Sequence, residues 1–161
     1  MKEKYSYWQL FFCGSIDGHI GSIYYFQRKF VKAKPFLEKS FVKHWSAKAM
    51  LAIIYFRDNS FINMDRVFES AVKYSPKESL LWSMWAFCYH KKGYNEKAIY
   101  ILVRGKNIIG GQDQRLLRNI INLKNDRKMK MKFYGDLWFQ FQLETSNSPK
   151  FFRSRMARHR K

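Results

Sequence analysis

The residue types most used in catalysis and metal binding are scattered along the 161 residues of this chain. The four histidines show no HxxxH or HExxH spacing, and the two cysteines, Cys13 and Cys88, lie far apart. The glycine pair Gly110-Gly111 lacks the Lys-Ser/Thr that follows in a phosphate-binding loop. We therefore predict no enzymatic activity, no metal and no cofactor.

The C-terminal residues indicate a different chemistry, the binding of anions. Phe151, Phe152 and Met156 lie among six lysine and arginine residues, and no acidic residue is present there. Such a segment could bind anionic lipid headgroups or the phosphates of RNA, and a merely solvated run of charge is the alternative. The candidate polyanion-binding residues are Lys150, Arg153, Arg155, Arg158, Arg160 and Lys161.

The whole chain is also strongly basic, with 31 lysine and arginine residues against 12 acidic residues and a formal net charge of +19. A charge of this size attracts nucleic acid, anionic lipid or an acidic protein. An AT-rich genome would raise the lysine content as well. Composition alone leaves both explanations open.

Helical hairpins are the elements expected to carry the remaining functional residues. Trp82, Trp85 and Tyr89 follow helical spacing on one face, with the small residue Ala86 beside them. Gly93 then ends the helix, and a second periodic run follows. A hairpin of this kind cannot bury its apolar face alone, so we expect further copies.

The same order of small and large residues recurs upstream. One copy contains Leu51, Ala52, Tyr55, Phe68, Ala71 and Pro76, and another contains Ile20, Gly21, Tyr24, Ala33, Leu37 and Ser40. The pattern resembles the tetratricopeptide repeat (TPR), with departures at Lys48 and Met64. The resemblance implies an all-α, right-handed superhelical stack of helix–turn–helix hairpins. The expected helix pairs are 14–28 with 30–43, 45–57 with 61–74, and 78–92 with 95–107.

In this family the first helix of each hairpin lines a concave groove that binds a peptide or helix. The resemblance therefore implies a protein–protein interaction scaffold, an adaptor whose partner is a protein or peptide of unknown identity. Ala49 and Ile53 stand where some members hold a carboxylate clamp, so we expect no such clamp. Ordinary packing between hairpins remains the alternative role for Phe56 and Phe87. The implied partner-binding residues are Tyr25, Phe26, Ile53, Phe56, Arg57, Phe87, His90 and Lys91.

Four segments complete the predicted organisation. Residues 1–13 form an apolar segment that covers the first repeat, and residues 14–126 form the TPR-like domain. This domain ends in a capping helix over residues 113–125, capped by Asp113, with Arg115, Arg118, Asn119 and Asn122 on its outer polar face. Residues 127–143, rich in lysine and aromatic residues, pack back on the repeats and partly fill the groove. Residues 144–161 form a disordered basic tail.

No apolar run of 18 residues is present, so no transmembrane helix is expected. Both cysteines lie among aromatic residues, which is typical of reduced cysteines in a core. We predict a cytoplasmic protein, with peripheral attachment to the inner face of a membrane through the basic tail as an open alternative.

Overall fold

The computed structural model describes the backbone of residues 2–144 and the side chains of residues 14–144. Within that part of the chain the regular structure is helical throughout, and no strand is present. The elements in order are α1 (Lys2–Phe26), α2 (Phe30–Lys39), α3 (Trp45–Arg57), α4 (Phe61–Tyr74), α5 (Ser79–Lys91), α6 (Asn95–Ile109), α7 (Gln114–Lys124), the 3-10 turn η1 (Lys132–Tyr134) and α8 (Asp136–Phe139).

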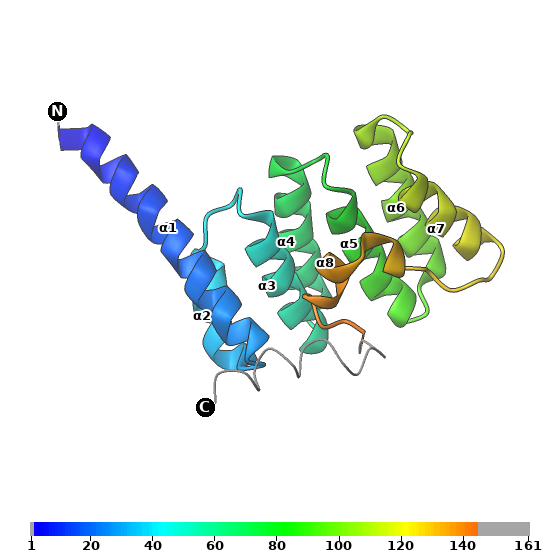
Figure 1. The fold of residues 1–161 in the computed structure, drawn as a ribbon, viewed down its shortest axis with the longest axis horizontal. Helices are drawn as coiled ribbons and strands as arrows, with labels where there is room; N and C mark the ends of the chain where they lie inside the picture. Colours follow the sequence, from blue (N-terminus) through cyan, green and yellow to red (C-terminus); the bar gives the residue numbers. More distant parts are fainter. Residues whose placement is uncertain (1, 145–161) are drawn as a thin grey trace, which may run out of the picture.

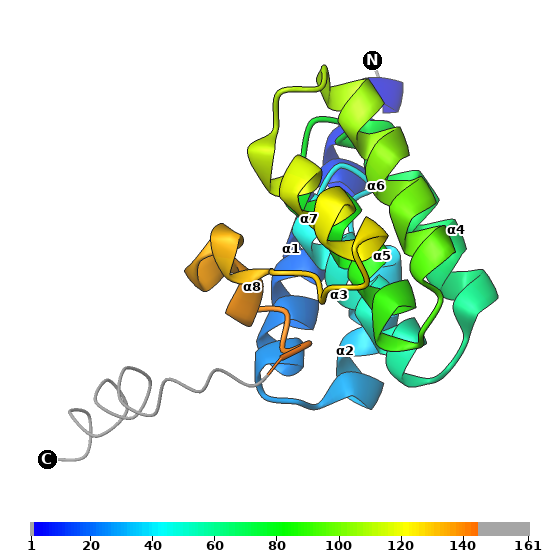
Figure 2. The same cartoon turned by 90° about the vertical axis from the view of Figure 1, so that its right-hand side faces the viewer.

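The first six helices pack as consecutive pairs, α1 with α2, α3 with α4 and α5 with α6, and the pairs stand side by side (Figure 1). Helix α7 packs on α6 at the far end of the stack. Figure 2 shows the C-terminal segment with α8 on the opposite side of the stack from α4 and α6. The predicted all-α class and its stack of helical hairpins are confirmed.

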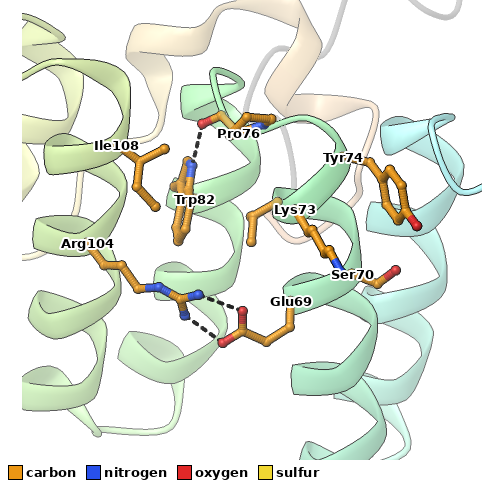
Figure 3. A pocket seen from close by; sticks show the side chains of 9 residues that line it. Glu69, Ser70, Lys73, Tyr74, Pro76, Trp82, Arg104 and Ile108 are labelled. Carbon is orange, nitrogen blue, oxygen red and sulfur yellow. Dashed lines mark hydrogen bonds and ion pairs between the residues drawn. The ribbon is translucent and has the colours of Figure 1, made fainter.

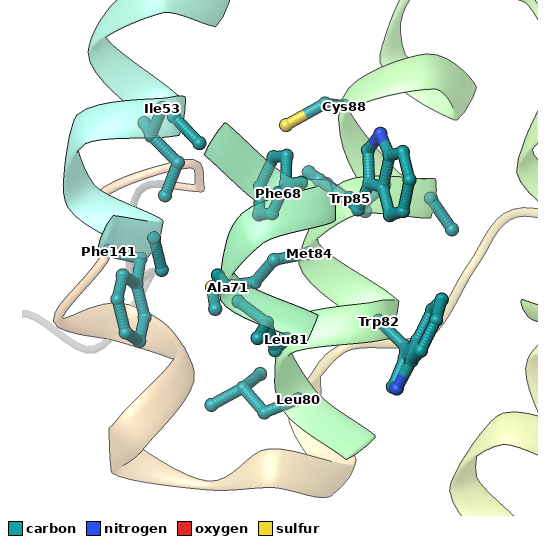
Figure 4. Packing of buried hydrophobic residues seen from close by; sticks show 14 of the residues in the cluster. Ile53, Phe68, Ala71, Leu80, Leu81, Trp82, Met84, Trp85, Cys88 and Phe141 are labelled. Carbon is teal, nitrogen blue, oxygen red and sulfur yellow. The ribbon is translucent and has the colours of Figure 1, made fainter. Parts of the chain in front are cut away.

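Small residues stand where neighbouring helices cross. Ala52, Ala71, Ala86 and Ala98 are each at most 1% exposed, which leaves no room for a larger side chain. Large rings fill the space between them, as Phe68 does by stacking on Trp85 with ring centroids 5.8 Å apart (Figure 4). The alternation of small and large residues therefore sets how closely the hairpins approach.

Each first helix ends in the same turn. Arg28, Asn59 and Gly93 follow α1, α3 and α5 with positive φ angles of 60°, 54° and 85°. The N–H of each of these residues donates to the carbonyl three residues earlier, and the N–H of the residue after it donates to the carbonyl five residues earlier. This pair of hydrogen bonds is the Schellman motif. The spacings of 31 (59 − 28) and 34 (93 − 59) residues match the recurrence of the sequence pattern.

Helix α7 ends in this turn as well, at Asp126, whose φ angle is 53°. The N–H of Arg127 donates to the carbonyl of Asn122, and the N–H of Asp126 donates to that of Leu123. The capping helix thus ends like the first helix of a fourth hairpin, but residues 127–131, which follow it, form no helix. Its predicted N-cap is confirmed, because the Asp113 carboxylate accepts from backbone N–H groups of the first turn.

The predicted boundary between residues 13 and 14 is not present in the structure. Helix α1 runs from Lys2 to Phe26 without interruption, so no boundary separates residues 2–13 from the rest of the first helix. The first half of α1 projects beyond the other helices in Figure 1. Helix α2 also ends earlier than expected, at Lys39 and not at residue 43. The predicted disordered tail, apart from residue 144, lies outside the described residues.

Lys48, one of the departures from the family pattern, has a specific structural role. Its side chain is buried, and Nζ donates to the carbonyls of Leu37 and Glu38 at distances of 3.1 and 3.0 Å. These carbonyls belong to the last turn of α2, whose acceptors lack partners within the helix. Burial lowers the pKa of Lys48. The lysine therefore ties the first hairpin to the second where an apolar residue could not.

A candidate peptide-binding groove

The groove is built on α1, α3 and α5, the first helices of the three hairpins. Tyr25 of α1, Ile53 of α3 and Phe87 of α5 are all at most 2% exposed. Residues 132–143 lie across these helices, as Figures 1 and 2 show for η1 and α8. The groove in this structure therefore contains a segment of the same chain.

Trp138 is the central apolar anchor of this segment. It is fully buried, and its ring meets that of Phe87 edge-on with centroids 4.8 Å apart. Its indole N–H donates to a carboxylate oxygen of Glu144 at 2.9 Å, so burial leaves no unpaired donor. The four-residue helix α8, which begins after Gly135, carries Trp138 into the groove.

Phe141 is the second anchor, and the main chain around it is held by hydrogen bonds. The ring is 2% exposed, with its centroid 6.2 Å from that of Trp45. The hydroxyl of Tyr25 donates to the carbonyl of Phe141 at 2.5 Å, and Arg57 donates to the carbonyl of Gln142 at 2.7 Å. Two groove residues thus recognise main-chain carbonyls, as a peptide-binding protein does with its ligand.

Burial raises the pKa of the Tyr25 hydroxyl, although the nearby Arg57 guanidinium acts in the opposite direction. The hydroxyl is therefore protonated at neutral pH and remains a donor to the Phe141 carbonyl. Both contacts with the main chain are independent of the side chains at 141 and 142.

Tyr134 fixes the start of the segment on α5. Its hydroxyl donates to the carbonyl of Ser79 at 3.2 Å and lies 2.7 Å from the hydroxyl of Ser83. Because that hydrogen is already used, the Ser83 hydroxyl acts as the donor to Tyr134. The guanidinium of Arg115 lies over the Tyr134 ring, 4.8 Å from its centroid. The segment is thus anchored at its beginning, middle and end.

Five of the eight predicted binding residues lie at the segment formed by residues 132–143. Tyr25, Ile53 and Phe87 are buried beneath or beside the segment, and Arg57 binds it directly. Phe26 is 49% exposed at the edge, where its carbonyl accepts weakly from the Gln142 side chain at 3.5 Å. These residues surround one groove.

The remaining predicted residues lie at the margin or elsewhere. Lys91 is exposed, with Nζ 5.4 Å from the centroid of Phe87, and His90 donates through Nδ1 to the side chain of Asn95. Phe56 meets Phe61 of α4 edge-on, at a centroid distance of 6.4 Å. This contact favours the packing role for Phe56, which joins the two helices of one hairpin. The predicted polyanion-binding residues 150–161 lie outside the described residues.

Sequence reasoning missed Trp45 and Asn119. Trp45 lies four residues before Ala49 and eight before Ile53, so helical spacing could have placed it in the same row. Asn119 was expected on the outer face of the capping helix, but it is fully buried. Its side chain accepts the backbone N–H of Lys130 at 2.8 Å.

A second cleft, of about 550 Å³, lies between α4 and α6 on the other side of the stack (Figure 3). Glu69, which lines this cleft, forms a bidentate ion pair with Arg104, with N···O distances of 2.5 and 2.8 Å. Trp82 donates its indole N–H to the carbonyl of Pro76 at the rim. The carboxylate and the indole that line the cleft are thus already paired with neighbouring groups, which favours a packing role for them over a role in catalysis.

Among the side chains of residues 14–144, no group of three His, Cys, Asp or Glu residues could hold a metal ion. Cys88 is buried and unpaired, and burial raises the pKa of its thiol. No helix in the described range is both long and apolar enough to cross a membrane. No family model matches the chain, and no curated protein matches its sequence.

Proposed function

We propose that this protein is a non-enzymatic interaction scaffold of the TPR type, which binds a peptide or helix in the groove formed by α1, α3 and α5. The observation that carries the proposal is the way residues 132–143 occupy that groove. Trp138 and Phe141 supply aromatic anchors, while Tyr25 and Arg57 bind main-chain carbonyls. These are the interactions of a bound peptide, made within one chain.

The internal segment competes with any partner. A tethered ligand has an effective concentration in the millimolar range, so an external segment must bind better or find the groove vacated. The partner expected from this chemistry carries two aromatic side chains and presents main-chain carbonyls to Tyr25 and Arg57. The exposed Lys91 at the margin favours an acidic residue near its aromatic anchor.

The test uses the full chain and a labelled peptide with the sequence of residues 132–144. Trp138→Ala removes the buried anchor of the internal segment and should raise the affinity for this peptide at least tenfold over that of the unaltered protein. Leu137→Ala is the matched control, because Leu137 is adjacent and 54% exposed. The affinity of Leu137→Ala for the peptide should equal that of the unaltered protein.

If both variants bind the peptide equally well, the internal segment does not exchange with an external peptide and the proposal is refuted.

The same two variants then serve in a pull-down from the native host at about 50 and 200 mM salt. Partners held by aromatic anchors persist at the higher concentration, whereas partners held by surface charge are lost. A partner captured only by Trp138→Ala at both concentrations would identify the natural ligand of the groove.

A further inference from the structure

Residues 127–131 connect α7 to η1, and their side chains alternate between the interior and the solvent. Met129 and Met131 are 6% and 1% exposed, while Lys128, Lys130 and Lys132 are all exposed. Residues 127–130 have no helical structure, whereas Met131 has helical backbone angles (φ −91°, ψ −12°) and Lys132 begins η1.

Asn119 holds residues 128–132, called the strip below, in place. Its carbonyl oxygen accepts the N–H of Lys130 at 2.8 Å, and its amide nitrogen donates to the Lys130 carbonyl at 3.4 Å. Asn119 is itself fully buried in the face of α7 that meets the strip. The main chain of Lys130 is therefore held through both its N–H and its carbonyl.

Among the described side chains, no acidic group forms an ion pair with a lysine of the strip. Within residues 14–144 the ion pairs involve Asp58, Asp65, Glu69 and Asp113, and none of them reaches Lys128, Lys130 or Lys132. Next to the strip, Phe133 is 38% exposed, and the guanidinium of Arg118 lies 5.4 Å from its ring centroid. The surface thus combines three exposed lysines with a partly exposed ring and an arginine over it.

We propose that Lys128, Lys130, Lys132, Arg118 and Phe133 form a binding site for single-stranded nucleic acid. The three lysines contact phosphates of the strand. Phe133 supplies a face on which a base stacks, and Arg118 contributes a further cation beside it. This site is separate from the groove and does not depend on the function proposed for it.

A membrane surface fits the same residues less well. Membrane-binding segments insert apolar side chains between lipid headgroups. Here the two methionines that alternate with the lysines are buried in the protein, so they are not available for insertion. Three exposed lysines beside a partly exposed ring suit a phosphodiester strand with a stacked base.

The test measures binding of fluorescein-labelled 12-nucleotide oligouridine RNA and oligothymidine DNA to the full chain by fluorescence anisotropy. Replacing Lys128, Lys130 and Lys132 together by alanine should weaken binding about 10- to 100-fold at 0.1 M salt. It should also reduce the slope of log affinity against log salt by about 2, at roughly 0.7 for each phosphate that a lysine no longer neutralises. Binding of either polymer supports the proposal only if it depends on the three strip lysines.

The matched control replaces Lys32, Lys39 and Lys43, three exposed lysines at the other end of the stack, by alanine. It changes the net charge by the same amount and should leave the affinity within about twofold. Replacing the three strip lysines by arginine should preserve binding, which separates loss of charge from loss of folding. Phe133→Ala should weaken binding at least fivefold without changing the salt slope.

Three results would overturn the proposal. One is no measurable binding of either oligonucleotide by the unaltered protein. Another is an equal effect of the strip and control triples, which would assign binding to overall charge or to the basic C-terminal residues. The third is a strip triple that loses binding to phosphatidylserine vesicles while keeping its affinity for both oligonucleotides, which would assign the strip to a membrane surface.

Discussion

The carboxylate of Asp65 joins three helices, and its removal provides a quantitative test of the packing. Asp65 lies on α4 and accepts the indole N–H of Trp85 at 2.8 Å and the hydroxyl of Tyr89 at 2.7 Å, both from α5. Lys97 of α6 donates to the same carboxylate at 3.0 Å and to the Tyr89 hydroxyl at 2.6 Å. Burial, together with the Asp65 carboxylate, raises the pKa of Tyr89 to about 12, so this hydroxyl is protonated at neutral pH.

The expected cost of Asp65→Ala follows from what each donor loses. Trp85 is 3% exposed, so its N–H is left buried without an acceptor, at a cost of about 1–3 kcal/mol. Tyr89 also loses its acceptor but keeps Lys97, which adds about 1 kcal/mol. The ion pair itself adds little, because the side chain of Lys97 is 48% exposed. We expect Asp65→Ala to lower the free energy of unfolding by about 2–4 kcal/mol.

Glu69→Ala is the matched control, one helical turn further along α4. Glu69 also pairs with a cation of α6, Arg104, but the two side chains are 46% and 35% exposed. An exposed pair contributes at most about 1 kcal/mol. The two variants remove the same type of charge from the same helix, so their difference isolates the buried hydrogen bonds.

Urea unfolding followed by circular dichroism and by tryptophan fluorescence measures both variants. With a slope of about 2 kcal/mol per molar urea, Asp65→Ala should lower the midpoint by about 1–2 M. Glu69→Ala should lower it by less than about 0.5 M. If the two midpoints coincide, the network around Asp65 does not hold the hairpins together and the reasoning fails.

Two further perturbations follow from single positions in the stack. Gly105→Ala should destabilise the protein by about 1–3 kcal/mol, because a Cβ at this position would lie 2.6 Å from the ring of Trp82. The midpoint of urea unfolding measures this loss. An unchanged or raised midpoint would contradict the close approach of Gly105 to Trp82. For Asp113, burial alone would raise the pKa, but hydrogen bonds from Arg115 and Ser79 outweigh it and lower the pKa from 3.8 to about 2. The cap therefore stabilises above pH 3.8, and this contribution is lost as the pH falls towards 2. Asp113→Ala should cost about 1 kcal/mol at pH 7 and progressively less below pH 4 in thermal unfolding scans, and a constant difference across this range would contradict the assignment.

The sequence alone was sufficient to predict where the hairpins lie. The order of small and large residues is a local property, since helical periodicity shows which face of each segment is apolar. The positions of the turns are also set by local sequence, and the turns at Asn59 and Gly93 could be predicted from the residue type. Arg28, in contrast, takes a positive φ of 60° for which its residue type gives no signal.

Segment 127–143 shows where local reasoning ends. Its aromatic content indicated that it must cover some apolar surface, because such rings are costly to leave in water. Which surface it covers depends on contacts between residues more than 100 positions apart, such as Tyr25 with Phe141. No spacing within the segment specifies a partner at that distance along the chain.

The sequence by itself therefore determined the helices, their pairing and the small residues at their crossings. The tertiary structure alone decided the roles of the buried polar residues Lys48 and Asn119 and of the half-buried Asp65. Each lies on a helix whose periodicity shows only that a face is apolar or polar, whereas its hydrogen-bond partners come from other helices or from the strip. A buried polar group is stable only if such partners are in place, and their arrangement exists only after the hairpins have stacked.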